Sequence, residues 1–163
     1  MKSIALIVLA FGVAAAGCAR DPKDQAFVTK ASQGGMAEVQ LGQLAATKGV
    51  AADVKAFGQR MVSDHTRAND ELKAAATAAG ATVSTELSSD QRDTLAKLDK
   101  EAAGQDFDSA YAKAMVKDHK EDIDLFRDEA SSGQNAGLKA YAQKTLPTLE
   151  EHLRMAQALK ANP

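Results

Sequence analysis

Four long segments of the sequence carry apolar residues every three or four positions, the spacing of one buried face of an α-helix. They cover residues 22–47, 51–79, 106–131 and 135–160. Asp21 precedes Pro22 at the first start, and Asp106 and Asn135 are the expected N-caps of the last two helices. Three prolines and eleven glycines in 163 residues are too few for the turns of a β-sandwich or barrel. The sequence therefore predicts an all-α bundle of four long helices.

The connections between these helices predict their topology. Short turns join the first helix to the second and the third to the fourth, so each pair is expected to be antiparallel. The residues between 79 and 106 suffice to cross the length of the bundle and include a short extra helix at 88–102. One long crossover is the ferritin-like arrangement. We therefore expect a ferritin-like four-helix bundle over residues 24–160.

Two short internal sequence similarities suggest that the two halves of the chain are related. Residues 55–60 resemble residues 139–144, and residues 61–65 resemble residues 115–119. The two similarities have different offsets, so they do not by themselves predict a simple duplication of one half of the chain.

The first seventeen residues have the features of an export signal. Lys2 precedes an apolar run over residues 4–16, which is too short to span a bilayer but has the length of a signal-peptide core. The run ends in Ala-Ala-Gly-Cys at 15–18. This resembles the bacterial lipobox, although Leu is usual where Ala15 stands. We expect residues 1–17 to be a lipoprotein signal peptide and Cys18 to be lipidated. An ordinary secretory signal, with Cys18 a free thiol, is the alternative.

This assignment predicts where the protein works. Residues 18–23 become a tether, and the bundle lies in the periplasm, anchored to a membrane through its lipid. Residue 19 is Ala rather than Asp, which by resemblance to lipoprotein sorting favours the outer membrane over the inner one. A net charge of −2 with both signs interspersed excludes a nucleic-acid partner. A single cysteine excludes a disulfide framework and a multi-cysteine zinc site.

The only three histidines each interrupt an apolar face. His65, His119 and His152 lie on the second, third and fourth long helices, and Glu38 interrupts the face of the first. Bundle proteins build metal sites from such inward side chains on facing helices, and neutral imidazole with carboxylate suits Zn, Fe or Cu. The sequence thus predicts a transition-metal site. The alternative is three histidines satisfied by hydrogen bonds in the core, with Glu38 in a salt bridge or reaching outward.

The carboxylates near these histidines favour one ion over two. A di-iron site uses Glu-x-x-His on two helices, but Val62 and Leu149 stand three residues before His65 and His152. Asp122, three residues after His119, is a further candidate ligand. Asp64 and Asp118 each directly precede a histidine, and we expect them to be solvated or at most to orient a ligand.

Three methionines also lie one helical turn from a candidate ligand, namely Met61, Met115 and Met155. Thioethers are soft ligands that suit copper, especially Cu(I). Methionine on a buried helix face is otherwise ordinary core packing. Copper bound partly by methionine is therefore an alternative composition of the site.

Several short motifs occur together in residues 24–160. They are Phe27-Val28, Gly35-Met36-Ala37-Glu38, the run from Phe57 to His65, Phe107-Asp108, Asp118-His119, and the run from Thr145 to Leu149 followed by His152. Together they resemble the bacterial family catalogued as domain of unknown function 4142. The resemblance implies an exported protein with a ferritin-like fold, and it implies no function.

The leading prediction is a lipid-anchored envelope protein that binds one transition-metal ion and handles or senses metal. One alternative is a ferritin-like metalloenzyme acting on oxygen or peroxide. The lack of bridging carboxylates, and of any other nucleophile or base cluster, favours a binding protein over an enzyme. The other alternative is an envelope structural or interaction protein that binds no metal.

Overall fold

A computed structural model describes residues 21–161, and within that range the protein consists of five helices with no strand. They are α1 (Pro22–Lys48), α2 (Ala52–Ala78), α3 (Ser89–Lys100), α4 (Gln105–Ser132) and α5 (Ala136–Ala161). This confirms the all-α bundle. The predicted signal peptide and Cys18 lie outside the described residues. None of the described helices has both the length and the apolar character needed to cross a membrane.

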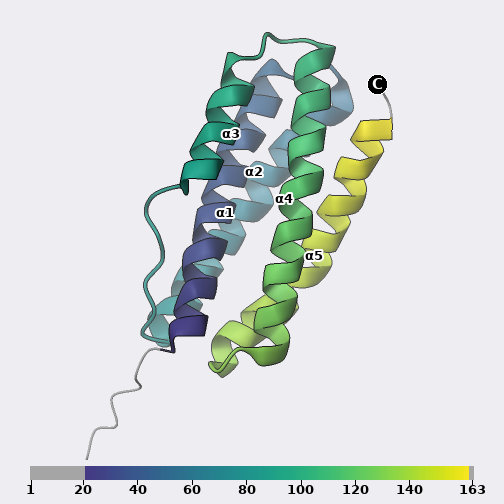
Figure 1. Cartoon of the computed structure of the whole chain (residues 1–163). Coiled ribbons are helices and arrows are strands. Elements are labelled where there is room, and N and C mark those ends of the chain that lie inside the picture. Colours follow the sequence, from purple (N-terminus) through teal and green to yellow (C-terminus); the bar gives the residue numbers. More distant parts are fainter. Residues whose placement is uncertain (1–20, 162–163) are drawn as a thin grey trace, which may run out of the picture.

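The four long helices lie side by side, and the connection from α2 to α4 runs the length of the bundle (Figure 1). As a result α2 and α4 point in the same direction, while α1 with α2 and α4 with α5 form antiparallel hairpins. The crossover contains α3, which packs against α1 and α4. The long crossover with its short helix is therefore present as the sequence predicts.

Two of the three N-caps expected from the sequence are present, those of α1 and α5. Asp21 accepts the Lys23 N–H at 2.8 Å, and Asn135 accepts the Gly137 N–H at 2.9 Å. The expected cap Asp106 is wrong, because α4 begins at Gln105 and Asp106 lies in its first turn. Gly104 is the N-cap, with φ of 157°, a backbone conformation that residues with a side chain rarely adopt.

The two hairpins hold each other through a pair of equivalent carboxylates. Asp24 in the first turn of α1 accepts two backbone N–H groups between α4 and α5, from Gln134 and Asn135, at 2.8 Å each. Asp108 in the first turn of α4 accepts those of Val50 and Ala51, between α1 and α2, at 2.9–3.3 Å. The two carboxylates are 84 positions apart, and so are the N–H groups they bind. The α1–α2 hairpin therefore matches the α4–α5 hairpin with an offset of 84 residues. The same offset relates residues 55–60 to residues 139–144.

Helices α1 and α2 approach each other closely where two glycines face each other. A Cβ on Gly42 of α1 would lie 2.6 Å from the Gly58 carbonyl oxygen, and one on Gly58 of α2 would lie 2.7 Å from that of Gly42. Both contacts are shorter than any real Cβ can make. The backbones of α1 and α2 thus touch here, four residues after Glu38 on α1 and seven residues before His65 on α2.

Two apolar clusters fill the core on either side of a polar layer. One cluster contains Phe27, Leu72, Ile123 and Leu138, and the other contains Leu41, Phe57, Met115 and Ala156. Along each long helix the residues of one cluster precede the polar position and those of the other follow it. The polar residues predicted from the sequence therefore share one level, halfway along the bundle.

Glu129 is a buried acid remote from that layer, and it predicts a pH dependence. It is 1% exposed, neither oxygen has a hydrogen-bond partner, and burial, with Asp24 nearby, raises its pKa from 4.5 to about 7. Because the folded state favours the protonated acid, stability should fall as the pH rises from about 4.5 to about 7. Glu129→Gln should therefore be about 1–3 kcal/mol more stable than the parent at pH 8.

At pH 5 the two proteins should have similar stability, because the parent acid is then protonated in the fold. Urea unfolding at both pH values measures the difference, and titrations common to both proteins cancel. A variant less stable than the parent at pH 8 would show that Glu129 acts as a stabilising carboxylate instead.

Candidate metal centre

Three imidazoles meet in the polar layer of the bundle. His65 of α2, His119 of α4 and His152 of α5 are 5%, 0% and 0% exposed. One potential ligand nitrogen from each ring lies within 4.8 Å of those from the other two, and the ring centroids are 5.4–5.8 Å apart. These three buried histidines are close enough to hold a metal ion.

Each imidazole has one nitrogen facing an oxygen acceptor. His65 Nδ1 lies 2.9 Å from Glu38 Oε2, His119 Nδ1 lies 3.0 Å from the Met115 carbonyl oxygen, and His152 Nε2 lies 3.0 Å from Asp64 Oδ2. Carbonyl and carboxylate oxygens accept hydrogen bonds, so the proton of each neutral ring belongs on the nitrogen that faces them.

The opposite nitrogen of each ring has no hydrogen-bond partner. These atoms are Nε2 of His65, Nε2 of His119 and Nδ1 of His152. In the neutral tautomer that the acceptors favour, each of them carries a lone pair. An imidazole whose N–H is held by an oxygen and whose other nitrogen is free has the arrangement found in metal-ligating histidines.

Glu38 on α1 connects two of the three rings. Its side chain is 1% exposed, with Oε2 facing His65 and Oε1 3.2 Å from His119 Nδ1. Burial acts to raise its pKa, but His119 and His65 outweigh burial and lower the pKa to about 2. Glu38 is therefore a carboxylate at neutral pH, and the structure places it behind the rings that it was predicted to join as a ligand.

The charge states of the rings follow from burial and from Glu38. Burial lowers the pKa of His119, and it lowers that of His152 to about 4. For His65, burial also acts to lower the pKa, but the Glu38 carboxylate outweighs it and the pKa rises. Burial thus favours the neutral rings of His119 and His152, while the Glu38 carboxylate favours the protonated, charged form of His65. A metal ion would have to displace a proton from His65, which makes binding pH-dependent.

Asp64 is the residue of this layer whose surroundings the sequence predicted least well. It is 8% exposed and reaches His152 of α5 rather than the histidine that follows it in the chain. Arg60 Nε and Arg67 contact its two oxygens at 2.6 and 3.0 Å. Arginines one turn before and one turn after Asp64 were the sequence signal that this carboxylate is held in place.

The remaining predicted ligands lie outside the three-histidine cluster. Asp122 lines a pocket beside Glu38 instead. Met61 and Met115 are fully buried in the apolar cluster around Phe57, and Met155 packs against that cluster. These positions agree with methionine as core packing, and a thioether ligand stays a prediction.

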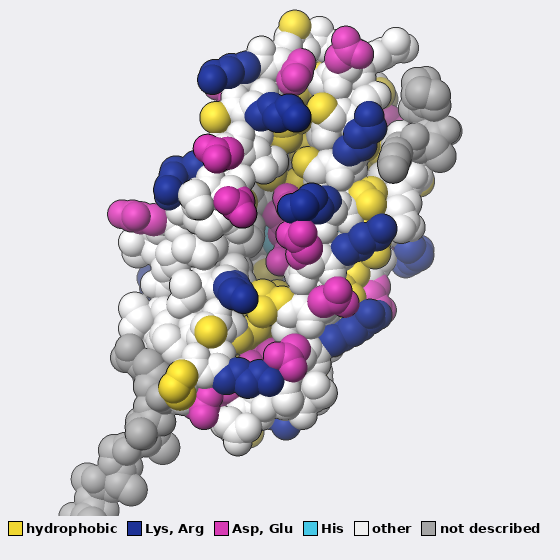
Figure 2. Space-filling view, in the orientation of Figure 1, with side chains coloured by type: hydrophobic (Ala, Val, Ile, Leu, Met, Phe, Trp, Pro, Cys, Tyr) yellow, Lys and Arg dark blue, Asp and Glu magenta, His cyan; other side chains and the backbone are white. Residues whose placement is uncertain are grey.

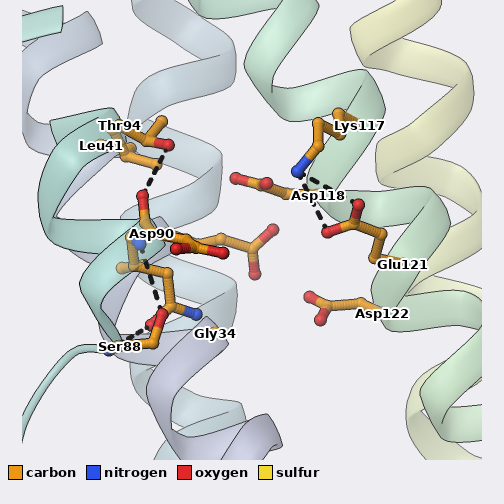
Figure 3. Close-up of a pocket in the computed structure, with 12 residues that line it drawn as sticks. Gly34, Leu41, Ser88, Asp90, Thr94, Lys117, Asp118, Glu121 and Asp122 are labelled. Atoms are coloured by element: carbon orange, nitrogen blue, oxygen red, sulfur yellow. Dashed lines mark hydrogen bonds and ion pairs between the residues drawn. The ribbon is translucent and has the colours of Figure 1, made fainter. Parts of the chain in front are cut away.

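A pocket of about 170 Å³ opens next to this centre, between α1, α3 and α4. Figure 2 shows the corresponding face hollowed along its middle, with acidic side chains inside the hollow. Glu38 lines the pocket from α1, and Asp118 and Asp122 line it from α4 (Figure 3). Burial and the nearby Glu38 raise the pKa of Asp118 to about 6 and that of Asp122 well above its ordinary value. The carboxyl groups are thus close enough to repel one another.

Comparison with known proteins gives a match to one family. A family model described as "Domain of unknown function (DUF4142)" matches residues 11–159. No curated protein and no solved structure matches the chain.

Proposed function

The chain belongs to the family described as "Domain of unknown function (DUF4142)", and because that description names no activity, we propose a function from the site itself. The protein binds one transition-metal ion through His65, His119 and His152, and handles or senses that metal in the cell envelope. In this proposal Glu38 and Asp64 hold the rings in place rather than binding the ion.

The observation that carries the proposal is the set of three unpartnered nitrogens. A buried polar atom without a partner costs about 1–3 kcal/mol, and three of them gathered within one layer are unusual for core packing alone. A metal ion would supply the missing partner to all three at once. Neutral nitrogen donors suit Zn, Fe or Cu.

The number of protein ligands helps to distinguish a metal-binding protein from a metalloenzyme. Structural zinc sites normally have four protein ligands, whereas catalytic sites have three and keep one position for water or substrate. Three histidines therefore leave room for a metalloenzyme acting on oxygen or peroxide. Binding remains the leading proposal, because the sequence has no Glu-x-x-His pair to bridge two ions.

The location is proposed from the sequence. The lipobox-like residues before Cys18 support a lipid anchor on the periplasmic side of a membrane, with the outer membrane favoured by Ala19. An anchor of this kind would hold a periplasmic metal-binding bundle at the membrane surface.

One experiment tests both parts of this proposal with independent readouts. The full chain and Cys18→Ala are expressed without a polyhistidine tag, cells are fractionated, and the purified proteins are analysed for metal. We expect the parent in membranes and the variant in the soluble periplasmic fraction, each with one transition-metal ion per chain. Unchanged fractionation, together with no mass increase from acyl chains on the parent protein, contradicts the anchor. Metal-free protein that binds no added Zn²⁺, Cu²⁺ or Fe²⁺ contradicts the metal centre.

A further inference from the structure

The pocket between α1, α3 and α4 is lined mainly by acidic side chains. Five carboxyl groups line it together with a single amine, that of Lys117; they are Glu38, Asp90, Asp118, Glu121 and Asp122. The amine is already paired with Glu121, 3.1 Å away. Figure 3 shows Asp118 and Asp122 pointing from α4 across the pocket toward α1 and α3. The charge of Lys117 also acts to lower the pKa of Asp118, whereas no cationic group of the lining acts in this way on Asp122.

Glu38 joins this pocket to the histidines. It lines the pocket, yet it is 1% exposed, and its oxygens have no hydrogen-bond partner beyond their contacts with His65 and His119. A group that enters the pocket meets a buried carboxylate that contacts two candidate ligands at Nδ1, the nitrogen opposite the unpartnered one. A positive ion is the species that such a carboxylate would stabilise.

Two features of the backbone support a built site. Asp122 is 84 positions from Glu38, the offset that relates the hairpins, so the two carboxyl groups occupy equivalent places on α1 and α4. Gly34 of α1 lies opposite Asp122, and a Cβ there would come within 3.3 Å of Asp122 Oδ1. A glycine at this point leaves space for the Asp122 carboxyl group beside Glu38.

We propose that this pocket captures a hydrated divalent cation and passes it to the three histidines. Asp118 and Asp122 are its first oxygen ligands, and Glu38 is the lining carboxylate that contacts two of the imidazoles. This rests on the proposed function, because it describes how the metal reaches that centre. Carboxylate oxygens are suited to a cation that still carries water, and a cleft lined by one sign of charge raises the rate of association about 10–1,000-fold.

The rate of Co²⁺ loading tests this route. Metal-free full-length protein is mixed with Co²⁺ in a stopped-flow instrument, and the visible absorption of the bound ion is followed. Asp118→Asn combined with Asp122→Asn should load about tenfold more slowly than the parent and reach the same stoichiometry. The control is Asp93→Asn combined with Asp124→Asn, which removes two exposed charges from α3 and α4 outside this pocket. It should load within twofold of the parent.

A second pair of variants leaves the buried carboxyl groups intact. Asp90→Lys places a positive charge at the exposed rim of the pocket on α3, a helix that carries no histidine. Asp93→Lys makes the same charge change on α3 outside the pocket lining. We expect Asp90→Lys to slow loading at least fivefold relative to Asp93→Lys. If the double asparagine variant does not fold, this pair of variants alone tests whether metal enters through the pocket.

The outcomes separate this inference from the function on which it rests. Normal final absorption with equal loading rates in the pocket and control variants overturns the route and leaves the metal centre standing. A parent protein whose histidines give no Co²⁺ signal contradicts the centre itself, and the route falls with it.

Discussion

Zn²⁺ at one hundred times its dissociation constant should raise the free energy of unfolding by about 3 kcal/mol, and His152→Leu should abolish that gain. An ion that binds the folded state alone stabilises it by mass action. His152 is the best single replacement of the three, because its partner Asp64 keeps Arg60 and Arg67 and no carboxylate loses its last partner. The metal-free variant should be at least as stable as the parent, since Leu removes an unpartnered buried nitrogen.

Urea unfolding with chelator and with excess Zn²⁺ measures both quantities. Met155→Leu is the matched control, since it lies three residues further along α5 and packs against the apolar cluster. It should keep the full metal effect, and loss of that effect would instead implicate the thioether. A parent whose unfolding is indifferent to Zn²⁺, Cu²⁺ and Fe²⁺ would contradict the metal centre.

Glu38→Leu should destabilise the metal-free protein by about 3–5 kcal/mol, the cost of removing one partner from a buried ion pair. Both His65 and His119 would lose the carboxylate that faces them. Glu38→Gln should cost less, because its amide oxygen can still accept from one ring. The control Glu150→Gln removes an exposed carboxylate that pairs with Arg127, and it should cost below about 1 kcal/mol.

The same carboxylate predicts how stability changes with pH. Its pKa in the folded state, about 2, lies below the ordinary value of 4.5. The stabilisation from Glu38 is therefore fully present above about pH 4.5 and is lost as the pH falls toward 2. Urea unfolding of the chelated proteins at pH 7 and pH 3.5 should show Glu38→Leu approaching the parent at the lower pH. An equally stable Glu38→Leu variant at pH 7 would show that Glu38 does not stabilise the core.

The helices and the composition of the site follow from local rules that a sequence displays directly. Asp21 followed by Pro22, and Asn135 two residues before Gly137, are chemical signals for helix starts, and the structure uses both. Three-to-four spacing places His65, His119 and His152 on inner faces, because that period is a property of the helix itself. The long crossover follows from the number of residues between α2 and α4.

Only the tertiary structure decided which partner each histidine has. Asp64 directly precedes His65 yet holds His152, and Glu38 lies behind two rings instead of beside them. One residue along a helix turns a side chain by about 100°, so the register and rotation of neighbouring helices determine what it meets. The register and rotation of the helices depend on contacts such as the touching backbones at Gly42 and Gly58. The spacing of apolar residues in the sequence does not reveal such contacts. The acidic pocket arises in the same way, because α3 brings Asp90 beside α4 and beside α1, which is distant in sequence.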